Sequence, residues 1–207
     1  MNVPEARRPL ASRSTRWAAF LSSAAVRAGL TADGISILSL VVAAAGAAAL
    51  LLLPRPWNLL ACAAGIQLRL MCNLLDGMVA IEGGRKSKVG VLYNEVPDRV
   101  ADSLFLVALG YEIGAPWLGW LAALAAAITA YIRVLGGTFG LAQDFRGPLA
   151  KQHRMFVMTL GCLLGFGEYF YDGGQRLLVA AAWIIAFGAI ITCGTRIRAI
   201  ARQLKAR

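Results

Sequence analysis

Five polar side chains recur at helical spacing within otherwise apolar segments. Asn73 and Asp76 are three residues apart, and Asn94, Asp98 and Asp102 follow at intervals of four. Residues three or four apart share one face of an α-helix, so each group would present its carboxylate and amide oxygens in one direction. Hard divalent cations prefer such oxygen ligands. The stretch between the two groups can bring two antiparallel helix ends side by side, so the pattern predicts a cation site.

The elements that must position these residues are predicted to be membrane helices. The chain has 207 residues, of which 58% are hydrophobic, and its mean hydropathy is +0.64. That is more apolar residue than a soluble core of this length could bury. Six runs approach the roughly 20 apolar residues that cross a bilayer: 35–53, 57–75, 100–113, 116–135, 155–166 and 177–193. The third and fifth runs are short, and they reach full length only if the polar turns beside them are also helical.

The charges are distributed in a way that predicts membrane topology rather than nucleic-acid binding. The formal net charge is +10. Basic residues gather before the first run, between the second and third, between the fourth and fifth, and after the sixth, whereas the other connections carry only Arg55 and Arg176. Positively charged loops stay in the cytoplasm. We therefore expect an even number of spans, both termini in the cytoplasm, and no nucleic-acid partner.

The N-terminal segment is predicted to lie on the membrane surface. Trp17 and Phe20 are interleaved with arginines, a pattern typical of an amphipathic helix in the headgroup layer. The recurring arginines are unlike a signal peptide. The expected fold is an all-α membrane protein with six transmembrane helices plus an N-terminal interfacial amphipathic helix. It forms a single domain with an interfacial segment at 1–30, a six-helix bundle at 31–195, and a basic tail at 196–207 that contacts anionic lipid.

Pro97 lies within the second polar group and lacks a backbone N–H. If a helix has already begun by Tyr93, Pro97 leaves the Tyr93 carbonyl without its usual donor and available to a ligand. If the helix instead begins near Pro97, the proline occupies a first turn, where it is tolerated. The sequence leaves both interpretations open.

The two polar groups together match a spaced pattern of residues. The pattern is Asn73-x2-Asp76-Gly77-x2-Ala80-Ile81-x8-Gly90-x3-Asn94-x3-Asp98. It closely resembles the signature of the CDP-alcohol phosphatidyltransferases, usually D-x2-D-G-x2-A-R-x8-G-x3-D-x3-D, and its spacing agrees at every step. The resemblance covers nearly the whole chain, because it extends to the basic N-terminal segment, to Thr31-Ala32-Asp33, and to Tyr131-x-Arg133.

The resemblance implies transfer of a phosphatidyl group from CDP-diacylglycerol to an alcohol acceptor, with release of CMP. It further implies a multi-pass protein of a bacterial-type inner (plasma) membrane, a homodimer, and a cytoplasm-facing cavity that holds Mg²⁺ or Mn²⁺. Carried over by position, the metal ligands would be Asn73, Asp76, Asn94 and Asp98, and Asp98 would also be the general base. Gly77, Ala80 and Gly90 would let the cytidine nucleotide approach the backbone.

A set of basic side chains is predicted to bind phosphate or the acceptor. The candidates are Arg85, Lys88, Arg133, Arg146, Lys151 and Arg154. An arginine at 133 would be costly facing lipid, so we expect it to point inward. The segment 143–154 mixes donors and acceptors and is our candidate for recognising the alcohol, including one that already bears a phosphate. The basic residues near 85–88 are interpreted equally well as a cytoplasmic topology signal.

Three residues depart from the family pattern. Asn replaces Asp at 73 and 94, and Ile81 stands where the family has Arg. An amide oxygen can coordinate a cation but brings no charge, so the sequence is compatible with either one or two bound ions. Asp102 is a further candidate ligand. Nearby basic side chains could replace the lost arginine. The alternative function is a degenerate family member that binds CDP-lipid or a partner enzyme without turnover.

Overall fold

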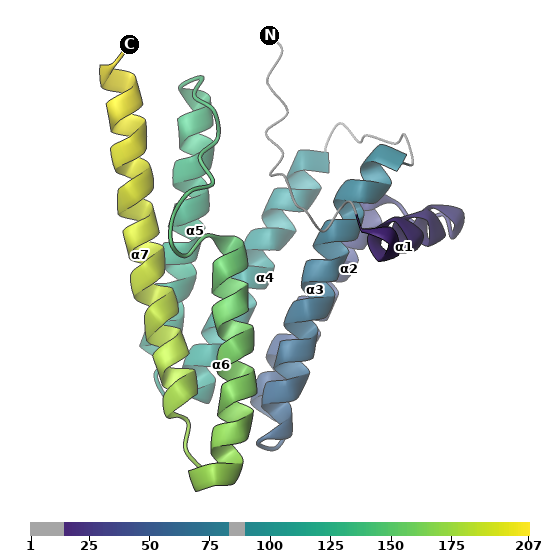
Figure 1. Ribbon diagram of the computed structural model, residues 1–207, viewed down its shortest axis with the longest axis vertical. Helices are drawn as coiled ribbons and strands as arrows, with labels where there is room; N and C mark the ends of the chain where they lie inside the picture. Colours follow the sequence, from purple (N-terminus) through teal and green to yellow (C-terminus); the bar gives the residue numbers. More distant parts are fainter. Residues whose placement is uncertain (1–14, 83–89) are drawn as a thin grey trace. The chain divides into compact units, whose positions relative to one another are not determined.

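The computed structural model describes residues 15–82 and 90–207, and this part of the chain forms seven α-helices (Figure 1). They are α1 (Arg16–Arg27), α2 (Ala32–Leu52), α3 (Trp57–Glu82), α4 (Gly90–Glu112), α5 (Pro116–Thr138), α6 (Lys151–Asp172) and α7 (Arg176–Lys205). The described residues contain no strand. The predicted all-α class is therefore confirmed.

Four of these helices are long and apolar enough to cross a membrane. They are Ala32–Leu52, Trp57–Ala80, Pro116–Thr138 and Arg176–Lys205. The helices α4 and α6 carry more polar residues, but they have 23 and 22 residues and include the polar turns that precede their apolar runs. This helical extension is what the short third and fifth runs required. The chain is thus a multi-pass membrane protein.

The helices form two compact units, and the boundary between them lies within α4, after Phe105. In the first unit, α2 and α3 lie side by side and α1 packs on α3 (Figure 1). The backbones of α2 and α3 touch at Gly46 and Gly65, because a Cβ built on Gly65 would lie 2.8 Å from Gly46 Cα. Such small residues allow membrane helices to approach closely. In the second unit, α7 packs against both α5 and α6.

The helix α1 is amphipathic, as the sequence predicted. Ala18 is fully buried and clusters with Leu74 and Met78 of α3, whereas Trp17 and Phe20 are exposed. An apolar exposed face of this kind is suited to the headgroup layer of a bilayer. Its insertion at the membrane surface stays a prediction.

The position of Pro97 decides between the two interpretations drawn from the sequence. The helix α4 begins at Gly90, so Pro97 lies well inside the helix and not in its first turn. The first-turn interpretation is therefore wrong. Because Pro97 has no N–H to give, the Tyr93 carbonyl lacks its usual donor four residues later.

Candidate active site

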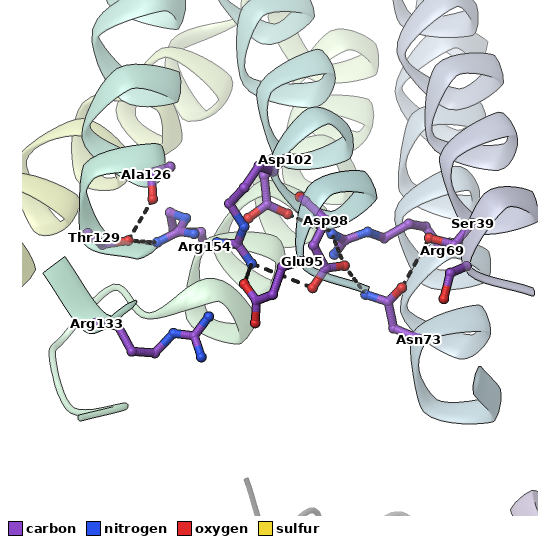
Figure 2. Close-up of polar contacts among 12 residues, drawn as sticks. Ser39, Arg69, Asn73, Glu95, Asp98, Asp102, Ala126, Thr129, Arg133 and Arg154 are labelled. Atoms are coloured by element: carbon purple, nitrogen blue, oxygen red, sulfur yellow. Dashed lines mark hydrogen bonds and ion pairs between the residues drawn. The ribbon is translucent and has the colours of Figure 1, made fainter. Parts of the chain in front are cut away.

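Asp98 is the centre of a buried polar cluster in the first unit. Asn73 of α3 donates a hydrogen bond from Nδ2 to Asp98 Oδ1 of α4, over 2.8 Å. The Asn73 Oδ1 in turn accepts a hydrogen bond from Ser39 Oγ of α2, over 3.0 Å. Figure 2 shows Asn73 between the two side chains, so three helices supply this chain of contacts. The serine was not predicted from the sequence.

Arg69 is the second member of the cluster that sequence reasoning missed. Its side chain is fully buried, and its Nη2 donates to Asp98 Oδ1 at 3.0 Å and to Asp102 Oδ1 at 2.9 Å (Figure 2). The same nitrogen also donates to the Asp98 carbonyl oxygen at 3.2 Å. Arg69 lies four residues before Asn73 and so shares its helix face. A charge inside an apolar run, one turn before Asn73, was the signal that could have identified it.

The remaining predicted metal ligands are placed differently. Asp76 is buried and accepts a hydrogen bond from Ser36 Oγ of α2, over 2.9 Å. Asn94 lies one turn before Asp98 on α4, but its side chain is exposed and makes no hydrogen bond to the other candidates among the described residues. The structure therefore brings Asn73 and Asp98 into direct contact, links Asp102 to them through Arg69, and leaves Asn94 at the surface.

A divalent cation at these side chains would require several oxygen ligands and negative charge. Among residues 15–82 and 90–207, no group of three or more His, Cys, Asp or Glu side chains is arranged to hold a metal. Asp76, Asn73 and Asp98 offer two carboxylates and an amide oxygen, which are the ligand types that one such ion prefers. The guanidinium of Arg69 bridges Asp98 and Asp102, where a second ion would need their oxygens. The set therefore does not fit two ions.

The small residues predicted to approach a nucleotide lie on the same two helices. Gly77 and Ala80 are half-buried near the end of α3, and Gly90 is the first residue of α4. Ala80 is four residues after Asp76 and so shares its helix face. The basic candidates Arg85 and Lys88 lie outside the described residues.

Three arginines of the second unit converge near Thr129 of α5, and we call Arg133, Arg154 and Arg196 the arginine cluster. Arg154 of α6 donates to Thr129 Oγ1 at 3.3 Å (Figure 2), and Arg196 of α7 donates to the Thr129 carbonyl oxygen at 2.6 Å. Arg133 lies one turn after Thr129 on α5. All three are buried, with exposed fractions of 9%, 1% and 5% for residues 133, 154 and 196.

The segment between α5 and α6 packs over this cluster. Arg133 donates to Gln143 Oε1, and its guanidinium carbon lies 5.2 Å from the centre of the Phe145 ring. Arg196 Nε donates to the Arg146 carbonyl oxygen at 2.9 Å. Arg133 was predicted to point inward, and its burial agrees with that expectation. Arg196 was assigned to a lipid-contacting tail, and its burial makes that interpretation wrong for this residue.

The other predicted acceptor-binding residues are less buried. Arg146 is exposed and forms an ion pair with Asp144, whose Oδ1 lies 3.0 Å from Arg146 Nε. Burial would raise the pKa of Asp144, but hydrogen bonds from the Arg146 side chain and backbone lower it overall. Lys151 is half-buried at the start of α6. Among the predicted basic residues that the structure describes, the deeply buried ones are therefore Arg133 and Arg154.

Comparison with curated proteins gives relatives over most of the chain, although no protein-family profile matches it. The chain is 27% identical over 200 residues to a phosphatidylinositol phosphate synthase of Streptomyces avermitilis, which covers 91% of this chain and 78% of that protein. The synthase of Mycobacterium marinum is 27% identical over 184 residues, covering 86% and 76%. The inner membrane protein YnbA of Escherichia coli K12 is 26% identical over 166 residues, covering 79% and 83%.

Solved structures share the fold. The phosphatidylinositol phosphate synthase of Mycobacterium tuberculosis in complex with manganese and citrate matches with a TM-score of 0.75 and 22% identity, over 88% of each chain. The same protein with CDP-diacylglycerol bound matches with a TM-score of 0.75 and 23% identity, over 90% of this chain and 94% of that one. At these identities the likeness establishes the fold.

Proposed function

This chain belongs to the CDP-alcohol phosphatidyltransferase family, and we propose that it transfers a phosphatidyl group from CDP-diacylglycerol to a phosphorylated alcohol, releasing CMP. The spaced signature on α3 and α4 and the curated relatives over most of the chain support the reaction. The arginine cluster supports the acceptor. The chain is accordingly a transferase of phospholipid synthesis.

The arginine cluster is the feature that supports a phosphate group on the acceptor. Buried guanidinium groups are costly unless anions or fixed acceptors surround them. Here Asp144 attracts Arg196, whereas Arg133 and Arg154 both lie near enough to repel it. A phosphate group bound by several arginines would offset that repulsion through charge-assisted hydrogen bonds. The curated relatives of Streptomyces avermitilis and Mycobacterium marinum are phosphatidylinositol phosphate synthases, so a phosphorylated inositol is the first acceptor to test.

The signature residues of the first unit would bind the donor lipid. Gly77, Ala80 and Gly90 would allow the nucleotide to lie close to the backbone of α3 and α4. Asp98 would accept the proton of the attacking hydroxyl. Its Oδ1 already accepts hydrogen bonds from Arg69 and Asn73, so the proton would go to Oδ2, which lies 3.5 Å from Arg99 Nη2.

The proposed cofactor is a divalent cation, either Mg²⁺ or Mn²⁺. Asp76, Asn73 and Asp98 would hold it, and the exposed Asn94 would join them only by changing its side-chain rotamer. When bound, such an ion neutralises charge on the pyrophosphate of the donor as CMP leaves. The solved relative in complex with manganese supports the use of a divalent metal.

The membrane arrangement is also proposed. We place all six helices from α2 to α7 across a bacterial inner membrane with both termini in the cytoplasm, and we propose a homodimer. The sorting of basic residues among the connections supports this topology. A cysteine introduced at Arg55 or at Arg176 should react with a membrane-impermeant maleimide in spheroplasts. Protection of both positions would refute the orientation.

The decisive experiment supplies purified protein with CDP-diacylglycerol, Mg²⁺ or Mn²⁺, and matched acceptors with and without a phosphate. We expect CMP release with inositol phosphate and little with inositol. Arg196→Gln should raise the KM for the phosphorylated acceptor by about tenfold or more, because a charged hydrogen-bond donor is lost. The matched control is Arg198→Gln on the same helix, where the side chain is exposed. Equal turnover of both acceptors would refute the phosphate assignment.

A second candidate function is favoured by the contacts of Asn73. Its amide donates a hydrogen bond to the Asp98 carboxylate, which therefore has a partner without any cation. This arrangement suits a protein that binds CDP-lipid or a partner enzyme without turnover. In that case CDP-diacylglycerol should raise the melting temperature while no acceptor yields CMP. Release of CMP with any acceptor would exclude this alternative.

A further inference from the structure

Arg69 is a cation held inside the cluster that should hold the metal. Its side chain is 0% exposed, within a helix apolar enough to cross the membrane. One nitrogen, Nη2, contacts Asp98 Oδ1, Asp102 Oδ1 and the Asp98 carbonyl oxygen. Nε and Nη1 make no hydrogen bond among the described residues. Burying a guanidinium removes it from water at a cost in free energy, and here its two carboxylate partners offset that cost and fix it in place.

The charges of the cluster match a single divalent ion. A signature with four acids would balance two divalent cations, but here two of its positions are Asn73 and Asn94. Asp76, Asp98 and Asp102 contribute three negative charges, and Arg69 contributes one positive charge. Arg99 lies beside Asp98 but is also paired with Glu95, so these two side chains add no net charge. The cluster is therefore left with two negative charges, which one divalent cation neutralises. A second ion would meet an excess of positive charge in a poorly solvated site.

Asn73 removes a second reason for an additional ion. An aspartate at this position would lie against Asp98 with like charge, and such a pair requires a cation between them. The Asn73 amide instead donates to Asp98 at 2.8 Å and accepts from Ser39 at 3.0 Å. The contact between α3 and α4 is therefore made by hydrogen bonds within the chain.

We propose that Arg69 is a built-in cation that takes the place of one divalent ion between Asp98 and Asp102, so that each chain binds a single divalent ion. This inference rests on the proposed function only in assigning a divalent cation to the cluster. It makes Arg69 a positioning residue, because it holds the two carboxylates of α4 against α3 and does so at every metal concentration.

The test is a Mn²⁺ titration of the full-length protein in detergent without any lipid substrate, with free Mn²⁺ measured by its electron paramagnetic resonance signal. The wild type should bind about one Mn²⁺ per chain. In Arg69→Gln the two carboxylates of α4 lose their fixed countercharge, and the stoichiometry should rise to about two. Arg69→Lys retains a cation and should stay near one. Arg99→Gln, the matched control, loses a charge beside the same Asp98 and should also stay near one.

Each outcome supports or overturns the assignment. A wild type that binds two ions, or none, overturns it even if Arg69→Gln does not fold. Arg69→Gln that folds, as judged by circular dichroism, and still binds one ion overturns it as well, and so does a rise to two in Arg99→Gln. Release of CMP is measured separately. If one Mn²⁺ binds but no CMP is released, the proposed function is refuted and this inference stands. If CMP is released but the stoichiometry differs from one, the proposed function stands and this inference is refuted.

Discussion

Replacing Gly65 with alanine tests the contact that holds α2 against α3. A Cβ on Gly65 would lie 2.8 Å from Gly46 Cα, 3.6 Å from Gly46 N and 3.8 Å from the Val42 carbonyl oxygen. Carbon atoms pack comfortably at about 3.5–4.0 Å, so the two backbones must separate locally by roughly 1 Å. Backbone atoms cannot rotate aside as the end of a long side chain can. Overpacking of this kind costs about 1–3 kcal/mol.

The separation should also reach the candidate site. The helix α2 carries Ser36 and Ser39, whose hydroxyls donate to Asp76 at 2.9 Å and to Asn73 at 3.0 Å. A shift of up to roughly 1 Å at these hydroxyls would weaken or break both hydrogen bonds. Gly65→Ala should therefore lower the affinity for Mn²⁺ as well as stability. At about 2–4 °C per kcal/mol for a chain of this size, the Tm should fall by roughly 2–12 °C.

A thiol-reactive fluorophore provides the assay, because Cys62 and Cys162 are fully buried and react only when the helices separate. The matched control is Gly194→Ala in α7, where a Cβ would meet no atom within 4 Å. That variant should melt at or slightly above the wild-type temperature, since alanine favours helix over glycine. If Gly65→Ala melted within about 1 °C of the wild type, the reasoning from the Gly46–Gly65 contact would be refuted.

Two further predictions concern charged side chains. Asp98→Asn should reduce CMP release by about 10²- to 10⁴-fold, the usual contribution of a general base, and activity within about tenfold of the wild type would contradict that role. Asp144 has a pKa lowered by Arg146, so its folded pKa is below its unfolded one. Its stabilising contribution is complete above the ordinary aspartate pKa of about 3.9 and is lost as the pH falls through the lower folded value. Amide-exchange protection of residues 139–150 should therefore decrease in acid for the wild type, whereas Asp144→Asn should be weakly protected throughout; equal pH profiles would exclude the effect.

The feature best predicted from the sequence is which polar residues share a face of one helix. Asn73 and Asp98 were each assigned to a helix face from intervals of three and four residues, and the structure brings these two side chains into contact. The same rule failed for Asn94, which shares the interval but is exposed. A spacing fixes which residues share a face, but the packing of one helix on another decides how much of that face is buried.

The partners of Arg69 and Arg196 could not be predicted from the pattern of charges along the sequence. Arg69 stands inside an apolar run, so its meaning depends on the acids of α4, which are far away in sequence. Arg196 begins a basic tail, and only the fold of the segment after α5 buries it under the Arg146 carbonyl. In both cases the partners are contributed by other helices or loops, and no local pattern encodes them.

The partners of these two arginines also indicate different roles, a structural one for Arg69 and an anion-binding one for Arg196. Arg69 contacts two carboxylates of its own unit, so its positive charge is neutralised within the chain and serves to arrange the acids. The hydrogen bonds of Arg196 go to the neutral carbonyl oxygens of Thr129 and Arg146, which orient the guanidinium without removing its charge. Asp144 attracts Arg196 but forms its own ion pair with Arg146. A guanidinium oriented by dipoles can still attract an anion, whereas one paired with two carboxylates cannot do so as strongly. For this reason we assign metal replacement to Arg69 and acceptor phosphate to the arginine cluster.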